Sequence, residues 1–151
     1  MIRKILVPTD GSERAEQAAD FAIELASGIG ASLIFLNVVD EITPAYAYEI
    51  ETGANLNIAE LDEERQKYAR SAVGRLVEKA KGAGVASEGK VIDGHPWQEI
   101  LKEADNLGAD HIVMGSHGRR ALAAAVLGNV TINVIHGSKI PVTVIPEKKE
   151  Q

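Results

Sequence analysis

The sequence contains no cysteine, and aromatic residues make up only 4% of it. The absence of cysteine excludes disulfides, thiol nucleophiles and zinc–thiolate sites, and it fits a reducing compartment. Alanine and valine are plentiful instead, and side chains this small suit close packing of helices on a sheet. The composition is that of an ordinary globular protein.

Long hydrophobic runs and an excess of positive charge are also missing. The apolar run Ile5 to Val7 is too short for the core of a signal peptide, and no segment approaches the roughly 20 apolar residues of a membrane span. A net charge of −6 disfavours binding to nucleic acid, which needs a basic face. We therefore expect a cytoplasmic protein that binds neither nucleic acid nor membrane.

Several catalytic signatures are absent as well. The chain has no Gly-Lys-Ser/Thr phosphate loop, no Gly-x-Gly-x-x-Gly dinucleotide fingerprint and no Gly-x-Ser-x-Gly elbow. No His, Asp or Glu cluster has the spacing of metal ligands, and no nucleophile–base pair is evident. The sequence thus predicts no catalytic or metal residue, and it favours binding over efficient catalysis, because phosphoryl-transfer enzymes show several dedicated groups.

Short apolar runs alternate with amphipathic stretches along the 151 residues, a length typical of one domain. This alternation predicts an α/β fold: a single doubly wound, five-stranded parallel sheet of order 3-2-1-4-5, with helices on both faces. The expected strands are residues 5–7, 32–39, 85–92 (at a sheet edge), 112–114 and 142–145. The expected helices are residues 12–26, 61–80, 96–107 and 129–136, with Ser12 and Pro96 starting the first and third and Gly28 and Gly30 ending the first.

Glycines at fixed offsets follow the fourth predicted strand. The run Met114-Gly115-Ser116-His117-Gly118 is followed by nine residues and then by Gly128-Asn129-Val130-Thr131. Glycine lets a ligand approach the main chain, and free N–H groups at a helix start suit phosphate. In the predicted sheet this segment meets Pro8-Thr9-Asp10 at the switch point between strands 1 and 4, where such sheets bind ligands.

The glycine pattern resembles the nucleotide-binding signature of the universal stress protein family, Gly-2x-Gly-9x-Gly followed by Ser, Thr or Asn. The segments Ile5–Ser12, Asn37–Asp40 and Pro141–Pro146 resemble that family's first, second and last strands, in the right order. The resemblance covers the chain except for residues 41–59. It implies a nucleotide-binding domain over residues 1–147, followed by a charged tail at 148–151.

The resemblance also implies ATP as the ligand, with any Mg²⁺ held mainly by the phosphates. Asp10 is implied to contact the nucleoside, beside Pro8 and Thr9, and Val38 to pack on the base. The backbone from Met114 and Gly115 through Ala121 and at Gly128 to Thr131 is implied to wrap the phosphates and ribose. The full candidate set is Pro8, Thr9, Asp10, Val38, Met114, Gly115, Ser116, His117, Gly118, Arg119, Arg120, Ala121, Gly128, Asn129, Val130 and Thr131.

Ordinary structural roles remain open for several of these residues. Asp10 can serve the turn that follows the first strand, Val38 can be plain core, and Asn129 can cap its helix. Arg119 and Arg120 suit phosphate by charge and shape, and a solvated surface pair is the alternative.

The histidines outside the motif are weaker candidates. His95 follows a strand and can border the crevice, or it can simply lie near the start of the next helix. His111 stands at the opposite end of the fourth strand and is expected to be structural. His136 lies near a helix C-terminus, where the helix dipole favours a cation.

The sequence therefore predicts an ATP-binding regulatory module of the stress response. The resemblance implies a homodimer formed through the last strand (Val142, Thr143, Val144 and Ile145), and the protein partner is unknown. Residues 40–59 are predicted to form a lid or partner surface that depends on the nucleotide. The alternatives are a slow ATPase or self-phosphorylating enzyme, a nucleotide-independent interaction module, and an adenosine-type binder.

Overall fold

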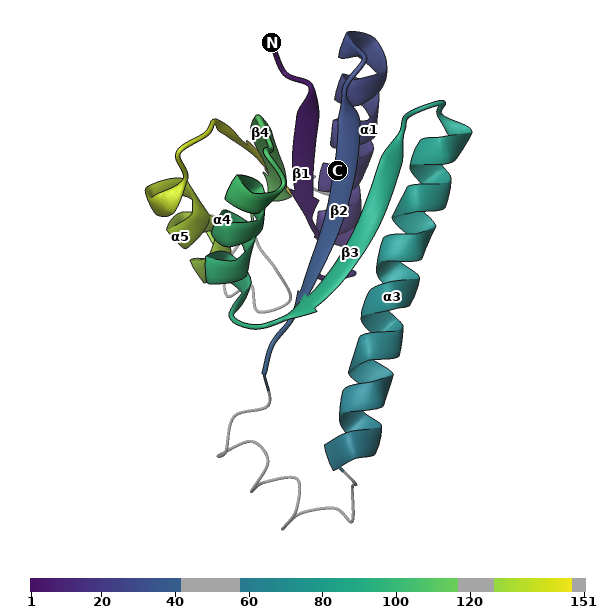
Figure 1. Cartoon of the computed structure of the whole chain (residues 1–151), viewed down its shortest axis with the longest axis vertical. Helices are drawn as coiled ribbons and strands as arrows, with labels where there is room; N and C mark the ends of the chain where they lie inside the picture. The colour runs from purple at the N-terminus through teal and green to yellow at the C-terminus, as the bar shows by residue number, and fades with distance from the viewer. Residues whose placement is uncertain (42–57, 117–126, 148–151) are drawn as a thin grey trace.

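The computed structural model describes residues 1–41, 58–116 and 127–147. Strands and helices alternate throughout these residues (Figure 1). The strands are β1 (Lys4–Pro8), β2 (Ser32–Val39), β3 (Ser87–Asp93), β4 (His111–Gly115) and β5 (Val142–Ile145). The helices are α1 (Glu13–Ile29), α3 (Ile58–Gly82), α4 (Pro96–Asn106) and α5 (Asn129–Gly137).

All five strands form one parallel sheet in the order β3-β2-β1-β4-β5, which confirms the predicted order. β1 lies in the centre of the sheet, and its residues Ile5, Leu6 and Val7 are fully buried because both faces of this parallel strand are covered. β3 is an edge strand, as predicted, and most of its residues are partly or fully exposed. The strand order reverses between β1 and β4, so the fold provides the expected switch point.

Helices cover both faces of the sheet (Figure 1). On one face, Ile5 and Phe35 pack against the alanine-rich side of α1 and against Leu76 of α3. On the other face, Leu6 and Leu36 belong to the core formed with α4 and α5. Neighbouring residues of a strand point to opposite faces, so this alternation divides the apolar side chains between the two cores. Among the described residues, no helix is long and apolar enough to cross a bilayer.

Most predicted helix ends are confirmed. Ser12 caps α1, since its Oγ accepts a hydrogen bond from the Ala15 N–H at 3.3 Å. Gly30 ends that helix in the left-handed conformation, whereas Gly28 lies inside the helix, so the prediction that Gly28 helps to end it is wrong. α3 begins at Ile58, two residues inside the segment predicted to be irregular.

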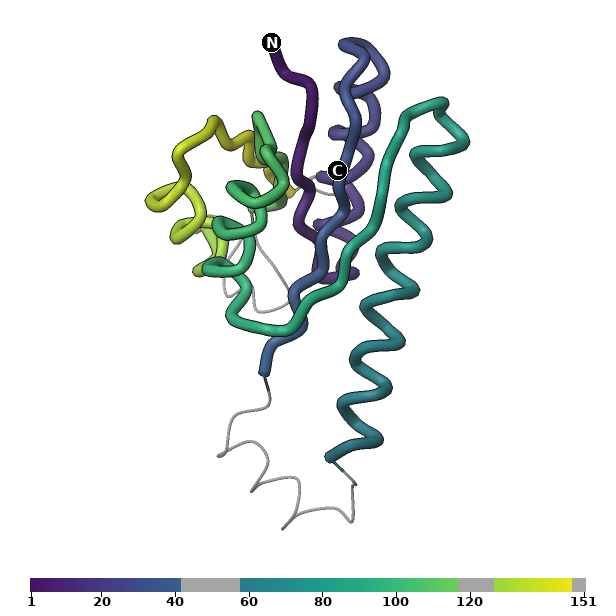
Figure 2. The backbone as a smooth tube through the Cα atoms, viewed as in Figure 1, coloured from purple at the N-terminus to yellow at the C-terminus, as the bar shows by residue number. Residues whose placement is uncertain are grey.

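The N-terminal turns of α3 extend past the carboxyl ends of the strands. Figure 2 shows this part of the helix reaching well beyond the last residues of β1, β2 and β3. The residues of α3 that are buried against the sheet begin only at Ala69. The preceding turns are therefore free to contact the loops that follow the strands. The predicted lid, residues 40–59, lies largely outside the described residues.

His111 occupies the start of β4, at the end of the sheet opposite to the switch point, as predicted. Its Nε2 lies 2.6 Å from Thr143 Oγ1 of β5, and its Nδ1 is buried without a hydrogen-bond partner in the described part of the chain. A charged imidazole needs acceptors for both ring N–H groups, and here one nitrogen has none. Burial accordingly lowers the pKa of His111 below 6.5.

We expect this lowered pKa to make the fold less stable in mild acid. Below pH 6.5 the unfolded chain takes up a proton at His111 while the folded chain resists it, so stability falls with pH until the lower folded pKa is reached. Urea unfolding at pH 7.5 and pH 5.5 should show a smaller acid-induced loss in His111→Gln than in the wild type. Equal losses in both proteins would contradict this role.

Candidate functional site

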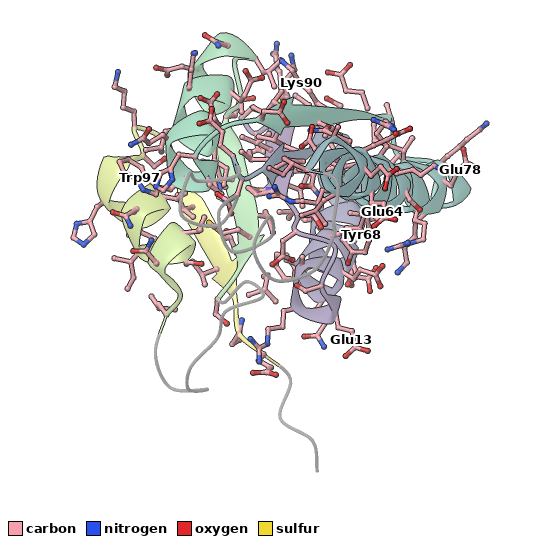
Figure 3. All side chains as sticks on the ribbon, turned by 90° about the horizontal axis from the view of Figure 1, so that it is seen from below. Glu13, Glu64, Tyr68, Glu78, Lys90 and Trp97 are labelled. Atoms are coloured by element: carbon pink, nitrogen blue, oxygen red, sulfur yellow. The ribbon has the colours of Figure 1, made fainter. Side chains whose placement is uncertain are left out.

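A cavity of about 780 Å³ opens at the carboxyl ends of the strands. It lies at the ends of β1 and β4, and the starts of α4 and α5 border it. Figure 3 looks onto this end of the sheet and shows Tyr68 of α3 and Trp97 of α4 on either side of the strand ends. The volume falls in the range of small-molecule sites, which occur at the switch points of such sheets.

Most of the predicted binding residues that the structure describes line this cavity. They are Pro8, Thr9, Asp10, Val38, Met114, Gly115, Gly128, Asn129, Val130 and Thr131. Ser116 is buried next to it, and its carbonyl oxygen accepts a hydrogen bond from the Gly128 N–H at 2.8 Å. The remaining candidates, His117, Gly118, Arg119, Arg120 and Ala121, lie outside the described residues. Segments more than 100 residues apart in the sequence thus meet in one place.

The turn after β1 is held by its own side chains. Thr9 Oγ1 accepts from the Gly11 N–H at 3.1 Å, and Asp10 Oδ1 accepts from the Ser12 N–H at 2.9 Å. Gly11 has φ +82°, and a Cβ at this position would lie 2.7 Å from the hydroxyl of Tyr68, so only glycine fits the turn. Asp10 therefore has the local turn role that the sequence left open, and its second carboxylate oxygen accepts no hydrogen bond within the described chain.

The opposite side of the cavity is formed by the end of β4 and the start of α5. Thr131 Oγ1 donates to the Gly115 carbonyl oxygen at 2.9 Å and so fixes α5 on the strand end. Gly128 occupies the capping position of α5 and Asn129 is the first helical residue, as the predicted bounds have it, so Asn129 does not take the capping role that the sequence left open. Its Oδ1 instead accepts from Asn133 Nδ2 at 3.0 Å.

Residues 129–131 line the cavity at the start of α5, where a helix leaves its first N–H groups without internal partners, and no hydrogen bond from these N–H groups is found within the described residues. Gly128 has no side chain that could cap them, and the first helical hydrogen bond runs from the Ile132 N–H to the Gly128 carbonyl oxygen. Free N–H groups and the positive end of the helix dipole together favour an anion.

Several lining residues were not predicted from the sequence. Trp97 packs against the core on the side of α4 and also lines the cavity. His95, which was expected at most to border the crevice, lines it too, with its ring 5.8 Å from that of Trp97 in an edge-to-face arrangement. Asp40, Glu41 and Arg65 are further polar residues of the cavity lining.

The described residues include no group of three or more His, Asp or Glu side chains that could hold a metal ion. The polar lining consists instead of separate carboxylates, the Arg65 guanidinium, the His95 imidazole, hydroxyl groups and the start of α5. This arrangement can hold a polar organic molecule that carries an anionic group at one end.

The model of the universal stress protein family matches residues 1–146. The chain belongs to this family. The coverage includes every described strand and helix, so the cavity lies wholly within the universal stress protein fold.

Two relatives from Methanocaldococcus jannaschii are similar over nearly the whole chain. The universal stress protein MJ0531 is 33% identical over 151 residues, covering 100% of this chain and 86% of the relative. The universal stress protein MJ0577 is 32% identical over 157 residues, covering 98% of this chain and 97% of the relative. The solved structure of MJ0577 superposes with a TM-score of 0.82 and covers 99% of both chains at 33% identity.

A further solved structure shows a universal stress protein in complex with cAMP. It is 25% identical to this chain, covers 97% of it and 99% of its own length, and superposes with a TM-score of 0.72. Nucleotide binding is therefore a property of a relative that shares this fold.

Proposed function

We propose that this universal stress protein binds ATP in the cavity at the switch point and acts as a nucleotide-dependent regulatory module. The observation that carries the proposal is the meeting of the β1 turn, the end of β4 and the start of α5 around one cavity. The binding of cAMP by a relative supports an adenine nucleotide as the class of ligand.

The two sides of the cavity suit different parts of ATP. The start of α5 offers free N–H groups, and no carboxylate from the described residues lines the cavity there, so it suits the phosphates. The other side combines the apolar side chains of Val38, Ile100 and Trp97 with polar groups, which suits a base and its ribose. Any Mg²⁺ would be held mainly by the phosphates and would keep several water ligands.

We also propose a homodimer that forms through β5. The two sheet edges differ in charge: β3 carries Glu88, Lys90 and Asp93, whereas β5 has the sequence Val-Thr-Val-Ile with no charge. Charged side chains protect an edge strand from pairing, and an uncharged edge is open to it. Apolar side chains are exposed on the neighbouring α5 as well, since Ile132 and Ile135 expose 37% and 42% of their surface.

Calorimetric titration of the purified protein with ATP, AMP and adenosine tests the nucleotide proposal. We expect one site per chain and an affinity that falls from ATP to AMP to adenosine, because each lost phosphate removes contacts with N–H groups. The single tryptophan, Trp97, lines the cavity, so its fluorescence should change with the same midpoint.

Other results would support the rival functions. Equal affinities for AMP and ATP would favour an adenosine-type binder. Binding of none of the three ligands would favour a nucleotide-independent interaction module.

A further inference from the structure

The N-terminal half of α3 is hydrogen-bonded to the loops that follow β1 and β2 and to the last residue of β3. Arg65 Nη2 donates to the Asp40 carbonyl oxygen, after β2, at 2.5 Å. Tyr68 donates its hydroxyl proton to the Gly11 carbonyl oxygen, after β1, at 3.3 Å. Gln66 donates to the carboxylate of Asp93 at the end of β3. This helix thus follows the border of the cavity, although the glycine motif includes none of its residues.

Arg65 is the member of this group that lines the cavity. Among the described lining residues it is the single lysine or arginine, and it lies on the same side as the carboxylates of Asp40 and Glu41. The hydrogen bond to the Asp40 carbonyl uses one of the five guanidinium N–H groups. Within the described chain, Arg65 forms no ion pair with a carboxylate. Donors therefore remain for a ligand.

The position of Arg65 decides which part of a nucleotide it can meet. Asp40 follows β2, and β2 is separated from β4 by β1, so Arg65 lies about two strand spacings, or roughly 10 Å, across the sheet from the Gly115 end. Two carboxylates, those of Asp40 and Glu41 after β2, line the cavity on this side, and Asp10 lies between the two sides, at the end of β1. These carboxylates repel phosphate, which is also negatively charged, whereas they do not repel the uncharged hydrogen-bond acceptors of a ribose or a base.

We propose that Arg65 is a nucleoside-binding residue of this site, donating hydrogen bonds to ribose oxygens or to ring nitrogens of the base. The inference rests on the proposed function and adds a contact from α3 to it. The bond to the Asp40 carbonyl holds the guanidinium at the rim, and the nearby carboxylates keep its charge compensated without occupying its remaining donors.

Titrations of Arg65→Gln with ATP, AMP and adenosine test this role. Loss of a charged hydrogen-bond donor should lower the affinity for all three ligands by the same factor, about tenfold or more, because all three contain the same nucleoside. Arg75→Gln is the matched control, since Arg75 lies on the same helix but pairs with Glu16 of α1 at 3.5 Å and does not line the cavity. It should bind all three ligands like the wild type.

A second variant separates a direct contact from simple attachment of the helix. Tyr68→Phe removes another hydrogen bond between α3 and the sheet at a residue that does not line the cavity, and it should leave all three affinities unchanged. If Tyr68→Phe loses as much affinity as Arg65→Gln does, the inference is overturned, because weaker attachment of the helix would then explain both losses of affinity.

Two further results would also overturn the inference. One is an Arg65→Gln variant with unchanged affinities, and the other is an Arg65→Gln variant that loses affinity for ATP but not for adenosine. In either case the wild type still binds, and the proposed function stands. Failure of the wild type to bind ATP at all would reject both proposals.

Discussion

Replacing Gly115 and Gly128 together by valine is expected to lower the affinity for ATP at least about 100-fold, equivalent to roughly 2.7 kcal/mol. Both glycines line the cavity on the side of α5. At Gly128 φ is −67°, a value that any residue adopts, so valine should not strain the chain. Its added methyl groups would instead keep phosphate away from the N–H groups at the start of α5. Calorimetric titration measures the loss.

The control for this pair is Gly28→Ala, at a glycine inside α1 where an added Cβ meets nothing within 4 Å. It should bind ATP as the wild type does. Thermal unfolding should show that the double valine variant is folded. If this folded variant binds ATP with wild-type affinity, the glycines only shape turns and the proposed phosphate end is wrong.

The second large effect is expected at the edge of β5: Val144→Pro should convert a dimer into a monomer. The carbonyl groups of Pro141 and Ile145 accept hydrogen bonds from the N–H groups of Ile112 and Ser116, so the odd-numbered residues here turn their backbone groups toward β4. Val144 is even-numbered, so its backbone N–H and C=O groups face outward. Proline there removes an outward N–H group and leaves the pairing with β4 in place. Sedimentation equilibrium at micromolar concentration should show at least tenfold weaker association.

Val91→Pro provides the matched control on the other edge of the sheet. The Ala86 carbonyl oxygen accepts a hydrogen bond from the Leu33 N–H of β2, so the even-numbered residues of this strand turn their backbone groups toward β2. Val91 is odd-numbered, so its backbone groups also face outward. This variant should remain dimeric. A wild type that sediments as a monomer, or a Val144→Pro variant that stays dimeric while folded, would reject association through β5.

The sequence is sufficient to predict the architecture because each element has a strong local signal. Ile5 to Val7 is a continuous apolar run, and Ser32 to Val39 has the bounds that the structure gives. Alternation of such runs with helical stretches restricts the topology to a parallel sheet, and the connection rules leave few strand orders. The meeting of Asp10 with Gly115 follows from that order, since both residues end strands on either side of the switch point.

The parts that could not be predicted depend on packing between elements. Trp97 has the spacing of a core residue, and the cavity beside it exists only because the starts of α4 and α5 border the same strand ends. Arg65 lies in a polar stretch of a long helix, and no local pattern shows that this turn reaches beyond the sheet. Gly28 was misplaced because one residue separates it from Gly30, and only Gly30 adopts the left-handed conformation that ends the helix.

The most direct test of the account is a crystal structure of the protein saturated with ATP. The account predicts the phosphates beside Gly115, Gly128 and the start of α5, and the nucleoside on the side of Val38, Trp97 and Arg65. A nucleotide bound outside this cavity, or bound with its phosphates beside the carboxylates of Asp40 and Glu41, would contradict it.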